Sequence, residues 1–147
     1  MEALVGLLGA LIGAYVAARY AEQNVRTAQI AALADFLSSV AKCLLEMEEA
    51  LANDIVPTGA GNRLEKVLAE FDATLDRAPV DESTRSELKN LGLRVQRCLI
   101  DGRFLDDAIR GHILREKEAE KKKMLRSMVQ VAGHLEGQAD VLRTIVK

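Results

Sequence analysis

The chain has 147 residues, enough for one domain with a single hydrophobic core and an appended segment. Its net charge of −2 argues against a dedicated nucleic-acid-binding domain, because such domains are usually strongly basic. Two cysteines, Cys43 and Cys98, are too few for a disulfide framework, so we expect them to be small buried side chains. Only two prolines occur, and long stretches rich in Ala, Leu, Glu, Lys and Arg favour helix, which predicts an all-α protein.

Residues 3–18 contain no charged side chain, which is typical of a helix in a membrane. Sixteen helical residues span about 24 Å, short of the hydrocarbon core of about 30 Å. Interfacial Tyr15 and Tyr20 and a snorkelling Arg19 would lengthen the span. We therefore predict a membrane anchor helix over residues 1–21. A signal peptide is disfavoured because no basic residue precedes the run, and a helix buried in a soluble assembly is the main alternative.

Small residues recur inside this run, at positions that a membrane helix uses for close packing. The set comprises Gly6, Gly9, Ala10, Gly13 and Ala14, and includes the G-x-x-x-G pair formed by Gly9 and Gly13. The pattern predicts self-association into a homo-oligomer, with membrane lipid as a second partner. Arg19 and Arg26 follow the run and no Lys or Arg precedes it, so residues 22–147 are expected in the cytoplasm behind a single membrane pass.

Beyond the anchor, apolar residues recur with the 3-4 alternation of a coiled-coil seam. The predicted seam consists of Ile30, Leu33, Leu37, Val40, Leu44, Met47 and Leu51. Because no glycine or proline lies between residues 14 and 56, the anchor should continue unbroken into this helix. The fold class is thus an all-α chain with a transmembrane-type helix continuous with a cytoplasmic three- to four-helix bundle or coiled coil.

Breaks between the later helices follow from turn signals. A loop is expected near residues 56–62, with Asn62 and Glu65 as a capping box for the next helix, and a second loop near residues 78–82. Asp101 and Gly102 signal a turn, yet the apolar stripe keeps its phase through them, so either a break or a kinked continuous helix fits. Residues 115–123 are polar on all sides and predict a helical extension that projects beyond the bundle or bridges packed regions.

Within that extension, Lys121, Lys122 and Lys123 are candidates for contact with anionic lipid headgroups or a nucleic-acid backbone. Aromatic residues for base stacking are absent from the stretch, which makes nucleic acid the weaker candidate. A solvated helix face with pairs such as Glu118 and Lys122 is the plain alternative.

No catalytic constellation emerges from the sequence. The His-Glu-x-x-His and Glu-x-x-His metal motifs and the phosphate-binding glycine loops are missing, so we expect no enzymatic activity, metal or cofactor. The pattern favours a membrane-anchored, self-associating helical protein that scaffolds an unidentified partner or, as a multimer, perturbs the membrane by forming a pore. Its architecture resembles that of accessory or effector components of bacterial defence and phage systems. The alternatives are a soluble helical adaptor with the apolar N-terminus buried in an oligomer, and a helical nuclease-like or nucleic-acid-binding domain with a degenerate site.

Overall fold

The computed structural model describes the backbone of residues 2–146 and the side chains of residues 5–113 and 115–146. Within that range the chain is helical and contains no strand, which confirms the all-α class. Its elements, in chain order, are α1 (Glu2–Ala52), α2 (Thr58–Arg77), α3 (Glu82–Arg110), the 3-10 helix η1 (Leu114–Lys117) and α4 (Glu118–Ile145).

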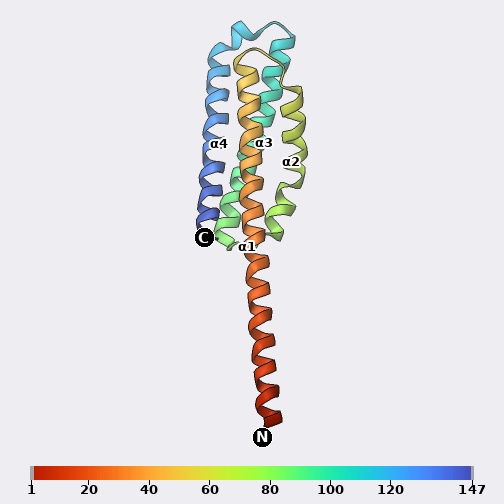
Figure 1. Cartoon of the computed structure of the whole chain (residues 1–147). Coiled ribbons are helices and arrows are strands. Elements are labelled where there is room, and N and C mark those ends of the chain that lie inside the picture. The colour runs from red at the N-terminus through yellow and green to blue at the C-terminus, as the bar shows by residue number, and fades with distance from the viewer. Residues whose placement is uncertain (1, 147) are drawn as a thin grey trace.

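The second half of α1 forms an up-down-up-down bundle with α2, α3 and α4 (Figure 1). Helices α1 and α3 each pack on both α2 and α4, and α1 and α3 also contact each other across the bundle. Residues 2–29 of α1, called here the projecting segment, extend below the bundle as a continuation of the same helix (Figure 1). The C-terminal end of α4 lies at the base of the bundle, beside the point where α1 leaves it.

Aliphatic side chains fill the bundle core, as the scarcity of aromatic residues requires. The seam of α1 packs there against the buried faces of the other three helices. These faces include Leu64, Phe71 and Leu75 of α2, Leu88, Leu91 and Val95 of α3, and Met128, Val131, Leu135 and Leu142 of α4. Burial of this apolar surface is the main force that holds the four helices together.

Helix α2 begins earlier than the capping signal at Asn62 indicates. Its first helical residue is Thr58, and Pro57 occupies the N-cap position without a side-chain hydrogen bond. The amide of Gly61 already donates to the carbonyl of Pro57 at 2.8 Å, so the two glycines of this stretch lie inside the first turn. Pro57 itself has φ −86° and ψ 50° and lies outside the helix, and the helix forms from Thr58 onward despite the glycine signal for a loop.

Helix α3 begins directly after the loop expected near residues 78–82, with Asp81 as its N-cap, and runs through the residues where a break or kink was left open. Asp81 Oδ1 accepts a hydrogen bond from the amide of Thr84 at 2.7 Å, which satisfies one of the free donors of the first turn. At Gly102 a Cβ would lie 2.8 Å from Sδ of Met47. This glycine therefore serves close packing of α3 on α1, and the helix continues to Arg110.

The chain turns instead at residues 111–113, a break that the sequence pattern did not indicate. His112 adopts a left-handed conformation with φ 57°, and η1 leads from there into α4. Residues 115–123, expected as a polar helical extension, are divided between a 3-10 turn and the start of α4. Lys121 is buried in this region, and its Nζ lies 2.7 Å from Oδ1 of Asp54.

Gly92 gives a test of the packing between α2 and α3. A Cβ at this position would lie 2.7 Å from the ring of Phe71, which itself packs on Phe36 with ring centroids 5.6 Å apart. We expect Gly92→Ala to lower the free energy of unfolding by about 1–3 kcal/mol through overpacking. Gly133 is the matched control, because nothing lies within 4 Å of its added Cβ. Gly133→Ala should raise the free energy of unfolding by about 0.5–1 kcal/mol in urea titrations, and equal effects of both changes would contradict the packing.

The Asp81 cap of α3 predicts how the stability of the protein depends on pH. Hydrogen bonds from the side chain and backbone of Thr84 lower the pKa of the Asp81 carboxyl below its ordinary value of 3.8. The stabilisation from this carboxylate is therefore present above about pH 4 and is lost as the pH falls through the lowered pKa. Asp81→Asn keeps a capping oxygen but does not titrate. Thermal melts between pH 6 and pH 2 should show a smaller acid loss of stability in Asp81→Asn than in the parent, whereas identical profiles would exclude this linkage.

Candidate membrane-contact and interaction surfaces

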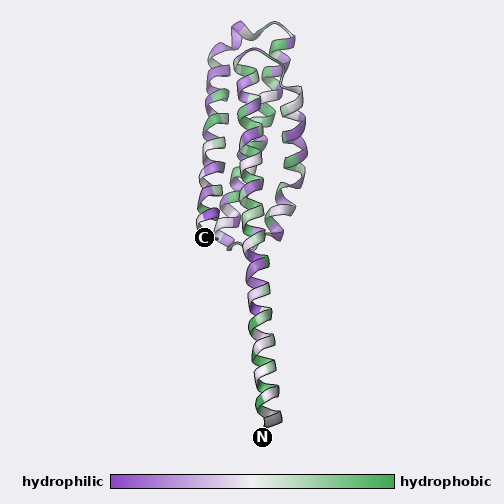
Figure 2. Cartoon of the chain, viewed as in Figure 1, coloured by the Kyte–Doolittle hydropathy of each residue, from purple (hydrophilic) through white to green (hydrophobic). Residues whose placement is uncertain are grey.

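The projecting segment exposes large apolar side chains along most of its length. Five of them are 53–69% exposed, namely Val5, Leu7, Leu8, Leu11 and Ile12. From Val5 to residue 29 every side chain is exposed except that of Thr27, which is half-buried. The hydropathy is high toward the N-terminal end and falls sharply just before the bundle (Figure 2). Apolar surface of this extent is rare on a soluble monomer and marks a site of contact with lipid or protein.

The predicted small residues gather on one side of the projecting segment. Successive helical residues advance by about 100°, which places Gly6, Gly9, Ala10, Gly13 and Ala14 on one half of the helix surface and Leu8, Leu11 and Ile12 on the other. All five small residues are exposed, and nothing lies within 4 Å of a Cβ added at any of the three glycines. No packing among the described residues therefore accounts for these glycines.

Each of the two faces of the projecting segment points in the same direction as the corresponding face of α1 within the bundle. Ten helical turns of 3.6 residues separate Leu8 from Leu44, which is buried in the core. The same interval separates Gly6 from Lys42 and Gly13 from Glu49, both exposed on the outer face of α1. The small-residue face thus points in the same direction as the outer face of α1 and away from the other three helices.

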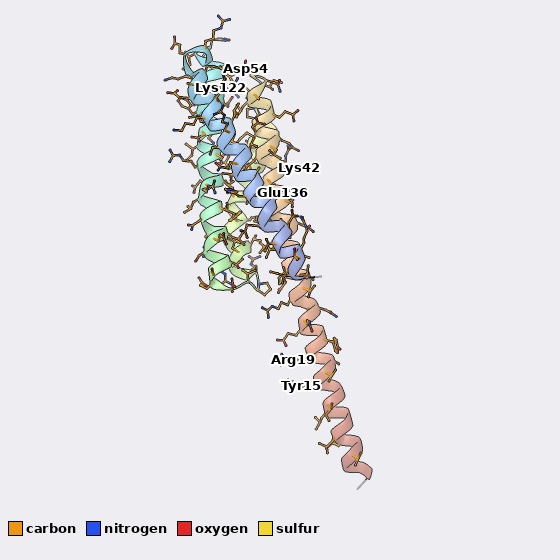
Figure 3. All side chains as sticks on the ribbon, turned by 90° about the vertical axis from the view of Figure 1, so that its left-hand side faces the viewer. Tyr15, Arg19, Lys42, Asp54, Lys122 and Glu136 are labelled. Carbon is orange, nitrogen blue, oxygen red and sulfur yellow. The ribbon has the colours of Figure 1, made fainter. Side chains whose placement is uncertain are left out.

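The projecting segment becomes polar from Arg19 onward, between its apolar part and the base of the bundle. Arg19 Nε donates to Tyr15 Oη at 3.3 Å, and the guanidinium carbon lies 5.8 Å from the centre of that ring. Both residues lie well below the bundle (Figure 3). An open groove of about 770 Å³ separates this part of α1 from Ile145 and Val146 at the end of α4. Tyrosine and arginine at the end of an apolar run are typical of a bilayer interface.

The seam residues fill the core of the chain's own bundle, which is one of the two arrangements that the sequence left open. All seven are buried, with exposed fractions of 6% or less, and they pack on α2, α3 and α4 of the same chain. They are Ile30, Leu33, Leu37, Val40, Leu44, Met47 and Leu51. The seam is therefore filled within the bundle, and no part of it remains free to align a second copy.

The three lysines lie at the end of the bundle that is remote from the projecting segment. Lys122 and Asp54 mark this end in Figure 3, opposite Tyr15 and Arg19. Lys121 is 7% exposed and engaged with Asp54, whereas Lys122 and Lys123 are exposed. The 23 residues of α1 from Ile30 to its end span about 34 Å. These lysines are thus about a bundle length away from any membrane that surrounds the projecting segment.

A feature that the sequence reasoning missed lies on the outer face of α3. Leu93, Ile100 and Phe104 are 64%, 56% and 41% exposed. They stand on the side of α3 opposite its buried row of Leu88, Leu91 and Val95. The signal was available, because these three residues fall outside the core alternation and a solvent face is normally polar.

The described residues offer little reactive chemistry. They contain no group of three or more His, Cys, Asp or Glu side chains that could hold a metal ion. Both cysteines are buried, and burial raises the pKa of the Cys98 thiol, which keeps it protonated and unreactive at neutral pH. His134 Nδ1 lies 2.7 Å from Nη1 of Arg94 and must accept that hydrogen bond, since a guanidinium only donates.

None of the helices in the described part of the chain combines the length and the apolar character needed to cross a membrane. Ala3 and Leu4, which begin the predicted span, lie outside the residues whose side chains are described. No family model, curated protein or solved structure matches the chain.

Proposed function

We propose that this chain is a non-enzymatic, membrane-anchored scaffold that self-associates within the bilayer and presents its helical bundle to a partner in the cytoplasm. One observation carries the proposal: residues 5–18 of the projecting segment expose apolar or small side chains on every side, and no other part of the described chain covers them. A helix that is apolar all round requires an apolar surrounding. The acyl region of a bilayer supplies it without another protein.

The short length of the apolar run is compatible with insertion. Arg19 can extend its charged end toward the headgroups while its stem remains among acyl chains, and Tyr15 and Tyr20 suit the interface. Arg19 and Arg26 both follow the run, which favours a cytoplasmic bundle. An apolar lining, with Tyr15 Oη as the one polar side-chain group in residues 3–18, makes a conducting pore the less favoured form of the assembly.

Self-association is proposed through the small-residue face of the projecting segment. Each exposed glycine inside a helix costs roughly 1 kcal/mol relative to alanine, a cost that close packing between helices offsets. The same direction leads to Asp35, Lys42 and Glu49 on the bundle. Parallel copies in register would bring each of these charges against its own counterpart. We infer that contact between copies is confined to the projecting segment and that the bundles splay apart above it.

The anchor is tested by fractionation of cells that express the full chain. We expect the protein to stay in the membrane pellet after carbonate extraction and to leave it only in detergent. The double variant Leu8→Arg/Leu11→Arg should move to the soluble fraction, because two central arginines cost about 6 kcal/mol of insertion. Ile55→Arg is the matched control, since Ile55 on the bundle is exposed to the same 59% as Leu11. Release of the parent by carbonate would refute the anchor and favour the soluble adaptor.

The association face is tested by oligomer size in detergent. Gly9→Ile/Gly13→Ile should reduce the oligomer to monomers, because two branched side chains separate the helix backbones. Gly133→Ile/Gly137→Ile is the control: it has the same spacing, equally open surroundings and a position in the bundle. Light scattering that gives the same mass for the first variant and the parent would show that copies meet elsewhere.

A further inference from the structure

We propose that the groove at the base of the bundle binds the phosphate of an anionic phospholipid, an inference that rests on the proposed membrane anchor and names a lipid class for it. This space of about 770 Å³, called here the base groove, is lined on α1 by residues that include Tyr15, Arg19 and Arg26, and on α4 by Ile145 and Val146. A guanidinium can give two parallel hydrogen bonds to a phosphate, so a groove with two arginines suits this ligand.

The two arginines point in the direction of the bundle core. The buried seam of α1 recurs at intervals of three and four residues, and Ile30 and Leu33 are its first two members. The same intervals, continued toward the N-terminus, fall on Arg26, Gln23 and Arg19. The row that is apolar and covered within the bundle therefore becomes polar and exposed directly below it.

This row lies far around the helix from the small-residue face. Thirteen residues separate Gly6 from Arg19, and thirteen separate Gly13 from Arg26, which places each arginine about 140° around the axis from its glycine. Copies that associate through the glycines would therefore leave both arginines directed away from the contact. The base groove of each copy would remain open to the surrounding lipid.

The depth of the base groove matches that of lipid headgroups. Arg19 follows the uncharged run of residues 3–18 directly, so it lies at headgroup level when that run occupies the acyl layer. Arg26 lies seven residues, or about 10 Å, farther along the axis. The headgroup layer is about 5–8 Å thick on each side of a bilayer. A phosphate between the two guanidinium groups is thus within the range that snorkelling arginines reach.

The charges of the base groove favour an anion. Arg19 and Arg26 face Glu22, the one acidic residue among the lining side chains. Among residues 5–113 and 115–146, neither arginine forms an ion pair with Glu22 or with any other carboxylate, and Arg19 contacts only the hydroxyl and ring of Tyr15. Both guanidinium groups therefore keep hydrogen-bond donors for a ligand. Lipid is the source of phosphate that the anchor itself places at this depth.

The chain carries an intrinsic probe for this site. Tyr15 and Tyr20 are its only tyrosines, both line the base groove, and the chain has no tryptophan. The full chain is placed in phosphatidylcholine nanodiscs, and its tyrosine fluorescence is quenched with nitroxide-labelled phosphatidylglycerol or nitroxide-labelled phosphatidylcholine. We expect phosphatidylglycerol to associate about fivefold more strongly, the effect of about one favourable charge contact near a membrane surface.

Arg19→Gln/Arg26→Gln should quench equally with both lipids. Its fold is not at risk, because both side chains are exposed and pair with no described carboxylate. Lys122→Gln/Lys123→Gln is the matched control: it removes the same charge from exposed positions at the remote end of the bundle and should keep the fivefold preference.

A second variant separates the base groove from a general attraction of positive charge to anionic lipid. Arg19→Gln/Ala21→Arg/Asn24→Arg/Arg26→Gln keeps the net charge and nearly the same depth, but each arginine moves by two residues, about 200° around the helix. The preference for phosphatidylglycerol should be lost. A preference that persists in this variant, or in Arg19→Gln/Arg26→Gln, would overturn the proposal.

The remaining arms distinguish the source of the phosphate and the state of the anchor. Replacing chloride with inorganic phosphate at constant ionic strength should leave the lipid preference unchanged, and its loss would assign the base groove to the free anion and refute a lipid site. Equal quenching of the parent by both lipids would refute the lipid site while the anchor stands. Quenching by neither lipid would show that the segment is outside the bilayer and would refute the anchor itself.

Discussion

The rigidity of α1 is the constraint on which the rest of the structure depends. No proline or glycine lies between residues 14 and 56, and the helix runs from Glu2 to Ala52 without interruption. In an unbroken helix the direction in which each side chain points is set by its place in the sequence, because every residue advances by a fixed angle about the axis. The face of the projecting segment that carries Gly6 and Gly13 is thereby tied to the face of the bundle that carries Lys42 and Glu49. Any contact made by the segment orients the bundle above it.

The 3-4 alternation predicted the buried residues of α1 correctly and left open which chain covers them. A seam such as Leu33, Leu37 and Leu44 must be covered, yet its spacing is the same whether the cover comes from the same chain or from another. The decision depends on whether later segments supply complementary faces, which α4 does with Met128, Leu135 and Leu142. Local periodicity thus identifies buried residues well and says little about which chain buries them.

The turn signal at Asp81 depends on a side chain that acts locally, whereas the signals at Gly102 and Lys121 failed because packing between distant segments decides there. Asp81 caps α3 through its own neighbour Thr84, so the start of that helix was readable from the sequence. Gly102 signals a turn in isolation, but its missing Cβ accommodates Met47, 55 residues earlier in the chain. Lys121 stands in a run of charges that predicts full solvation, yet Asp54, 67 residues away, pairs with it and allows its burial. Contacts between residues this far apart in the chain cannot be recognised in a short window of sequence.

The arrangement of the helices separates the surface through which copies would associate from the outer face of α3. Among the described helices, α2 and α4 each pack on both α1 and α3 but not on each other, so α1 and α3 occupy opposite corners of the bundle. Their outer faces consequently point in opposite directions. If copies associate through the small-residue face, which shares its direction with the outer face of α1, the outer face of α3 is turned away from the neighbouring copy. An oligomer built in this way would present α3 of every chain at its periphery, so a partner that binds there would meet several copies at once, which raises avidity without any new contact.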